Sequence, residues 1–89
     1  MLRKDIEIIN KLGMHARAAA KFVTLAQTFH ADIRIARNGK EVNGKSIMGV
    51  MMLAAAKGST IELIINGEDE DKAMQHLTEL IHNRFDESE

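Results

Sequence analysis

The sequence contains no cysteine, proline, tryptophan or tyrosine, and it has only three phenylalanines. Without cysteine, the chain cannot form disulfides, thiolate metal sites, iron–sulfur clusters or a thiol nucleophile. It also has no apolar run close to the roughly 18 residues that a membrane-spanning helix requires. These absences exclude thiol-based redox chemistry and predict a water-soluble domain without membrane insertion.

Neither sign of charge dominates, since 12 Lys and Arg residues face 13 Asp and Glu residues, for a net charge of −1. This balance does not favour nucleic acid as a partner, so we expect proteins or small anions as partners.

The length of 89 residues predicts a single domain spanning residues 1–89. Because the Met1–Lys4 segment has no apolar core or cleavage signature, we expect no signal peptide and a cytoplasmic location.

Alternating apolar and polar residues predict the strands of a sheet. The alternation runs over residues 3–9 and again over residues 32–36, and Asn38-Gly39 is a typical hairpin turn before residues 40–43. The β-branched segment Thr60–Ile65 predicts a further strand, which Asn66 and Gly67 end.

Helical periodicity lies between and after these strands. Apolar residues recur at three- and four-residue steps over residues 16–29. A second helix is expected over Ile47–Ala56, ended by Lys57 and Gly58. Acidic residues 68–71 favour the N-terminal dipole of a third helix, and we expect the tail, residues 86–89, to be frayed.

The resulting order β-α-β-β-α-β-α does not alternate strands and helices one to one, and it contains a hairpin. It therefore predicts an α+β fold, an open-faced two-layer sandwich with a four-stranded, mostly antiparallel sheet. We expect the three helices to cover one face of the sheet and water to cover the other.

His15 stands where a loop becomes a helix N-terminus, in the segment Gly13–Arg17. The first backbone N–H groups of the helix, at Ala16, Arg17 and Ala18, lack intrahelical acceptors and could bind a phosphoryl group. Arg17 adds a cation, and the positive helix end favours a neutral, nucleophilic imidazole. On spacing alone, a single histidine before a helix is more often an ordinary polar surface residue.

Two longer stretches of sequence make the functional interpretation of His15 more specific. The stretch GMHARAAAKF, the stretch NGKSIMGVMMLAAAKG over Asn43–Gly58, and the expected element order closely resemble the HPr family. HPr proteins are phosphocarriers of the bacterial phosphoenolpyruvate-dependent phosphotransferase system. The resemblance implies that His15 accepts a phosphoryl group on Nδ1 from enzyme I and passes it to enzyme IIA domains in sugar uptake.

This resemblance also implies a covalent carrier rather than an enzyme with its own turnover. We expect a monomer that needs no cofactor and no metal ion. The pattern departs from the family at one place, because Ala18 stands where HPr proteins usually carry proline. Losing a compatible proline costs about 0.4–1 kcal/mol through the entropy of the unfolded chain, and it restores a backbone N–H beside the expected phosphate.

Ser46 precedes the second expected helix and suits the N-cap position. The resemblance adds a second role, since HPr proteins of bacteria that possess HPr kinase/phosphorylase are phosphorylated at this serine. The two roles are compatible.

The apolar run after Ser46 is too long for a short helix that buries only one face. Helical spacing predicts that Val50, Leu53 and Ala54 face inward. A partner-binding surface would then consist of Ile47, Met48 and Met51 together with Arg17, Ala20, Lys21 and Thr24.

The remaining histidines, His30, His76 and His82, lack the spacing of a metal site and are expected to be solvated. Three alternatives to a sugar-branch phosphocarrier stay open. The first is NPr, the nitrogen-related relative, and the second is a regulatory protein that acts by binding alone. The third is a structural or small-ligand module that uses no phosphate.

Overall fold

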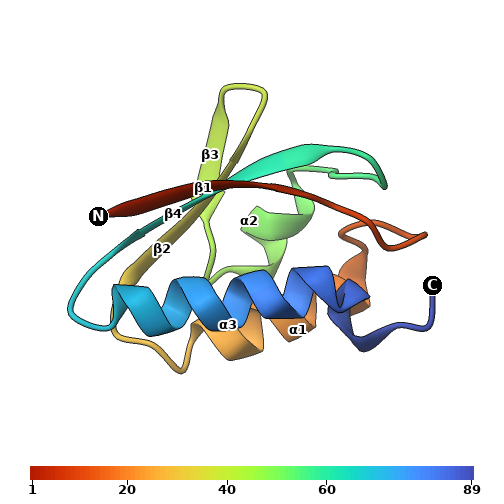
Figure 1. Ribbon diagram of the computed structural model, residues 1–89. Helices are drawn as coiled ribbons and strands as arrows, with labels where there is room; N and C mark the ends of the chain where they lie inside the picture. The colour runs from red at the N-terminus through yellow and green to blue at the C-terminus, as the bar shows by residue number, and fades with distance from the viewer.

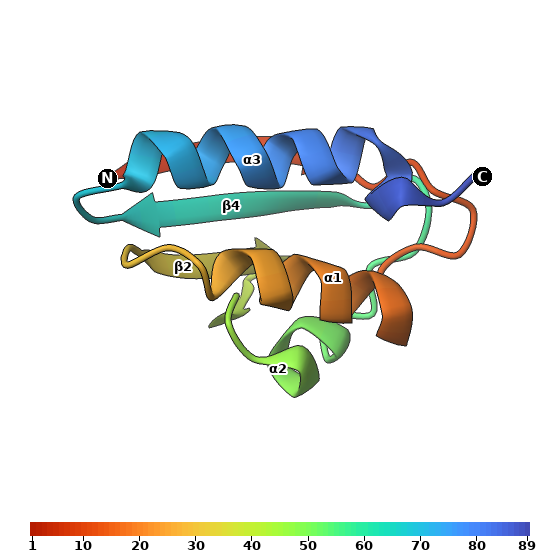
Figure 2. The same cartoon turned by 90° about the horizontal axis from the view of Figure 1, so that it is seen from below.

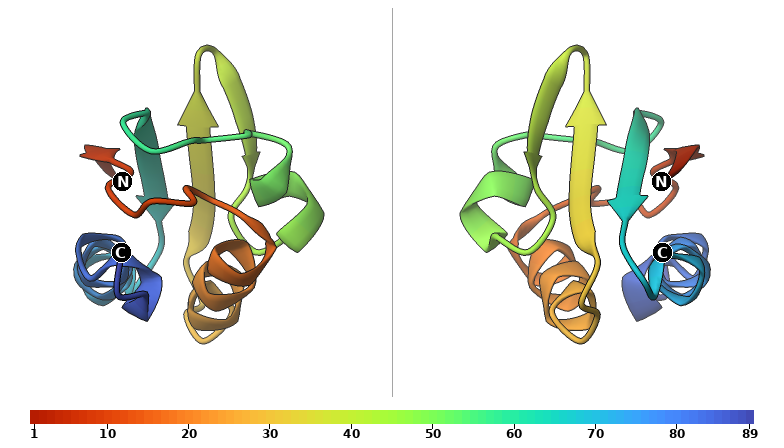
Figure 3. Two further views of the ribbon diagram at one scale, coloured as in Figure 1. Left: turned by 90° about the vertical axis from the view of Figure 1, so that its right-hand side faces the viewer. Right: turned by 90° about the vertical axis from the view of Figure 1, so that its left-hand side faces the viewer.

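One antiparallel sheet organises the fold, and the computed structural model describes all residues from Met1 to Glu89. Its strands lie in the order β1-β4-β2-β3. They are β1 (Leu2–Glu7), β2 (Asp32–Arg37), β3 (Lys40–Asn43) and β4 (Thr60–Asn66). Helices α1 (Ala16–Ala26), α2 (Ile47–Met51) and α3 (Glu70–His82) cover one face (Figures 1 and 3). The predicted α+β layout is confirmed.

The register of the sheet separates an apolar face from a charged face. Ile6 of β1 pairs with Ile61 of β4, and both are buried under the helices. On the other face, Arg3 forms an ion pair of 3.4 Å with Glu62. Because side chains alternate along a strand, this register places Ile6 and Ile61 in the core and Arg3 and Glu62 on the opposite face.

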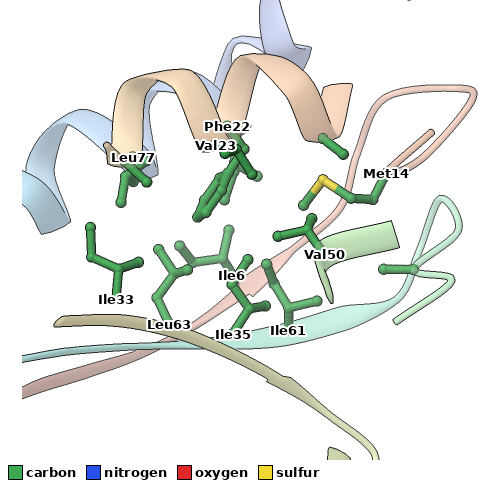
Figure 4. Close-up of a cluster of buried hydrophobic side chains, with 14 of the residues drawn as sticks. Ile6, Met14, Phe22, Val23, Ile33, Ile35, Val50, Ile61, Leu63 and Leu77 are labelled. Carbon is green, nitrogen blue, oxygen red and sulfur yellow. The ribbon is translucent and has the colours of Figure 1, made fainter. Parts of the chain in front are cut away.

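Helices α1 and α3 lie side by side against the apolar face (Figure 2). Phe22 and Val23 of α1 and Leu77 of α3 point toward the sheet, while Met14 and Val50 fill the end near α2 (Figure 4). None of the helices is long and apolar enough to cross a membrane. The core therefore joins the three helices to strands β1, β2 and β4, and Val42 of β3 packs against it.

Two predicted helix boundaries are wrong. Helix α1 ends at Ala26 rather than residue 29, and α2 ends at Met51 rather than Ala56. After α2, Ala54 adopts a positive φ of 50° and turns the chain outward, so Ala55 is buried in place of Ala54. Arg37 donates to the Leu53 carbonyl at 3.0 Å and helps to fix this turn. Tertiary contacts override the helical propensity of the alanine run.

Helix α3 begins at Glu70, two residues later than the acidic segment suggested. The Asp69 carboxylate does not cap its own helix. It accepts hydrogen bonds from the backbone N–H groups of His30 and Ala31, at 2.8 and 2.9 Å. Asp69 therefore ties the start of α3 to the loop after α1.

The prediction of a frayed tail is also wrong. Arg84, Phe85 and Asp86 all adopt positive φ angles between 53° and 63°, which turns the chain back toward α1. Phe85 is fully buried, and Lys21 donates to its carbonyl oxygen at 2.9 Å. Burial of this one aromatic ring fixes the C-terminal segment against the body of the protein.

The loop before α1 depends on Gly13, and this dependence is testable with Gly13→Ala. Gly13 has a φ of +67°, and a Cβ there would lie 2.6 Å from the Ala55 carbonyl oxygen. Gly39→Ala is the matched control, because Gly39 has a φ of +81° and nothing within 4 Å of its Cβ position. Both variants should lose about 1–2 kcal/mol to the left-handed backbone, and Gly13→Ala about 1–3 kcal/mol more from overpacking.

Urea denaturation of both variants measures the two free energies of unfolding. Equal losses in the two proteins would contradict the close approach of Gly13 to Ala55.

Candidate functional site

His15 is the N-cap residue of α1, with extended backbone angles and no capping hydrogen bond from its side chain. The buried side chain of Met14 and the turn at Gly13 hold the preceding loop in place. The backbone N–H groups of Ala16, Arg17 and Ala18 donate to no acceptor in the protein. His15 therefore directly precedes three backbone N–H groups that have no acceptor in the protein; their role in binding a phosphoryl group stays a prediction.

The buried side chain of Asn10 holds the loop before α1 by hydrogen bonds. Its side chain is fully buried, and its Nδ2 donates to the Gly13 carbonyl at 2.8 Å and to Glu87 Oε1 at 2.9 Å. Its Oδ1 has no partner. No pattern in the sequence singles out Asn10.

Glu87 reaches the same place from the far end of the chain. Its Oε2 contacts Nε2 of His15, and the side chains of the two residues are 16% and 26% exposed, respectively. A separation of 72 residues hides this pair from any local pattern. The only signal in the sequence was the acidic character of the tail.

Burial, hydrogen bonds and the nearby charges of His15 and Lys21 together set the charge state of Glu87. Partial burial opposes ionisation, but the hydrogen bonds from Asn10 and His15 outweigh it and lower the pKa of the Glu87 carboxyl below its ordinary value. The stability that these contacts add is present above the ordinary pKa of a glutamate. It is lost as the pH falls through the lowered pKa.

Arg17 is exposed and forms no hydrogen bond or ion pair. It borders a hollow of about 280 Å³ between the loop at Lys11 and Leu12 and the C-terminal segment. A free guanidinium beside an open hollow can meet an incoming anion without first breaking a contact. The side chain is therefore available for the role that its position predicts.

Ser46 caps α2 as predicted. It has extended backbone angles, and its Oγ accepts a hydrogen bond from the backbone N–H of Gly49 at 3.1 Å. Its place as a modification site stays a prediction.

The proposed docking residues lie on two neighbouring helices. On α2, Ile47, Met48 and Met51 are 43%, 74% and 42% exposed, whereas Val50 is buried. On α1, the expected residues line a groove of about 560 Å³ whose opposite wall includes Leu80 of α3; they are Arg17, Ala20, Lys21 and Thr24. The α1 part therefore faces α3 as well as solvent, which the sequence did not predict.

Two further apolar side chains near this region are exposed, namely Leu12 in the loop before His15 and Met52 after α2. The predicted docking surface does not include either residue.

The other histidines, His30, His76 and His82, are all exposed. No group of three or more His, Cys, Asp or Glu side chains is arranged to hold a metal ion.

Comparison with known proteins shows the family of the chain. The family model described as the PTS HPr component phosphorylation site matches residues 2–83. The chain belongs to the HPr family. It is 56% identical to the phosphocarrier protein HPr of Neisseria meningitidis serogroup A, over the full length of both chains.

Solved HPr structures share the fold. HPr-C-His from Thermoanaerobacter tengcongensis superposes with a TM-score of 0.96 at 43% identity, covering all of both chains. An HPr dimer from the same organism gives a TM-score of 0.79 at 44% identity, covering 98% of this chain and all of the other. HPr proteins are phosphocarriers of the phosphotransferase system, and family membership therefore places His15 in a chain of this class.

The departure from the HPr pattern at Ala18 has a simple structural setting. The Ala18 side chain is fully buried in the first turn of α1, and its N–H has no acceptor in the protein. A proline there would lose no hydrogen bond. The alanine therefore keeps the first turn intact and leaves one more donor beside His15.

Removing the cap of α2 should destabilise the protein. Ser46→Ala loses the acceptor for the Gly49 N–H, and N-cap replacements of this kind cost about 0.5–2 kcal/mol. Ser46→Asp is the matched control, because aspartate also caps well. Thermal unfolding followed by circular dichroism should show a lower Tm for the alanine variant alone, and equal Tm values in both variants would count against the cap.

Proposed function

We propose that this chain accepts a phosphoryl group on Nδ1 of His15 from phosphorylated enzyme I and delivers it to enzyme IIA domains in sugar uptake. The observation that carries the proposal is the placement of His15 in an HPr-family chain. Its Nε2 is occupied by Glu87, and the free N–H groups of the first turn of α1 lie beside it. The relay would operate in the cytoplasm.

The transfer itself needs few groups. The Nδ1 lone pair attacks phosphorus, the bond from phosphorus to the donor breaks, and its electron pair leaves with the donor. Backbone N–H groups of Ala16, Arg17 and Ala18, with the Arg17 guanidinium, then bind the phosphoryl oxygens. This is a moderate clamp, which suits a carrier that must release its cargo to the next protein.

A single carrier must dock on several proteins, and the α2 surface fits that task. Ile47, Met48 and Met51 form an exposed apolar patch, and methionine adapts to differently shaped partners. Helix α2 lies against α1, whose first residues follow His15 (Figure 2). We propose that each partner meets one monomer of the carrier, since one chain supplies the histidine and both parts of this surface.

We also propose that Ser46 is a regulatory phosphorylation site for an HPr kinase/phosphorylase. Ser46 directly precedes the exposed Ile47 and Met48. A phosphate carries a charge of about −1.5 to −2 at neutral pH, and at Ser46 it would disfavour the docking of an acidic partner surface.

The long apolar block after Ser46 favours the sugar branch over NPr. Comparing transfer to sugar-specific and nitrogen-specific enzyme IIA proteins separates the two.

His15→Ala should abolish phosphorylation, because no other side chain combines a free ring nitrogen with the helix end. The assay is incubation with phosphoenolpyruvate and enzyme I, followed by intact-mass measurement of an acid-labile phosphoryl group. His76→Ala, which alters an exposed histidine on α3, is the control and should be labelled like the wild type. Equal labelling of His15→Ala would disprove the assignment.

Met48→Asp should weaken binding to enzyme I by about tenfold or more, since it places a charge at the centre of an apolar contact. Gln75→Asp adds the same charge on an exposed position of α3 and serves as the control. Isothermal titration calorimetry gives both Kd values, and circular dichroism checks that both variants are folded. An unchanged Kd for Met48→Asp would remove α2 from the docking surface.

A further inference from the structure

Glu87 has a partner for each of its carboxylate oxygens. Asn10 Nδ2 donates to Oε1 at 2.9 Å, and Nε2 of His15 contacts Oε2. The three side chains are buried or largely buried, so water competes little for these contacts. This trio joins the loop before α1 to the C-terminal segment.

The chain adopts an unfavourable backbone to make this arrangement. Three consecutive residues other than glycine, Arg84 to Asp86, have positive φ angles, a conformation that L-residues rarely adopt. Burial of Phe85, the hydrogen bond from Lys21 to its carbonyl, and the bond from the Lys11 N–H to the Glu89 carbonyl at 2.7 Å hold the turn. Backbone strain that the surroundings maintain is common at functional sites.

The orientation of the Asn10 side-chain amide determines the hydrogen-bonding role of Glu87. Asn10 Nδ2 also donates to the Gly13 carbonyl at 2.8 Å, so the NH₂ group, and not Oδ1, must face Gly13 and Glu87. An ionised carboxylate only accepts hydrogen bonds, and the lowered pKa of Glu87 keeps it ionised at neutral pH. Nε2 of His15 must therefore carry the hydrogen in the contact with Oε2.

We propose that Glu87, oriented by Asn10, is a positioning residue that holds His15 in the Nε2–H tautomer and so leaves the Nδ1 lone pair to accept the phosphoryl group. This proposal rests on the proposed function. When the Nδ1–P bond forms, Nε2 keeps its proton and the ring gains a positive charge. The Glu87 carboxylate stabilises that charge, and the lone pair returns to Nδ1 when the group is passed on.

Glu87→Gln tests the tautomer directly. Because Asn10 presents a donor, the oxygen of the Gln side chain should turn toward Asn10, which places its NH₂ group against Nε2 of His15. Nε2 must then accept, and the ring proton moves to Nδ1. The isosteric change thus reverses the hydrogen bond without removing the side chain.

Long-range ¹⁵N–¹H NMR spectra of the unphosphorylated full chain, recorded where the imidazole is neutral, report the tautomer. We expect Nε2–H in the wild type and a predominantly Nδ1–H ring in Glu87→Gln. Glu89→Gln is the control, since it removes the same charge from the same segment at an exposed position whose ion pair with Lys11 lies on the surface. It should keep the wild-type tautomer.

The second measurement is kcat/KM for phosphorylation of each variant by enzyme I and phosphoenolpyruvate. Glu87→Gln should lose about tenfold or more, as is typical when a histidine loses its orienting partner, while Glu89→Gln keeps the wild-type value. An unchanged tautomer in Glu87→Gln overturns the proposal, and so does a changed tautomer with an unchanged rate. Absence of labelling in the wild type would instead refute the proposed function and leave the tautomer measurement valid.

Discussion

Burial of the single apolar face of the sheet is the constraint on which the rest of the structure depends. The buried isoleucines and leucines of β1, β2 and β4 need a cover, and α1 and α3 supply it with Phe22, Val23 and Leu77. Once these helices are packed on the sheet, the loop from β1 to α1 must cross the end of the sheet. That crossing places His15 at the edge of the core with one side open to solvent.

The same packing brings the loop before α1 and the C-terminal segment together at the candidate site. Phe85 is buried beneath α1 and α3, and the left-handed turn around it directs Glu87 back to His15 and Asn10. A carrier this small cannot enclose its cargo. Under the proposed function, its own contribution is to orient one imidazole and to present a few donors, and each partner would supply the rest of the transfer machinery.

Local patterns predicted most of the fold because they record which face of each element is buried. Alternation identified β1 and β2, the Asn38-Gly39 turn indicated β3, and the β-branched run indicated β4. Helical spacing identified α1, and the acidic residues 68–71 marked the start of α3. The patterns failed at Ala54, where propensity favours a helix but packing of Leu53 and Ala55 turns the chain. They failed again at the tail, because a polar segment gives no sign that Phe85 anchors it.

By itself, the sequence determined the α+β class, the position of His15 at a helix start, the cap at Ser46 and the resemblance to the HPr family. Each of these depends on neighbouring residues, so it can be recognised along the chain. Only the tertiary structure decided that Asn10 and Glu87 meet His15 and that the α1 surface borders α3. Contacts between residues so far apart arise when the whole core is packed, and no local pattern encodes them.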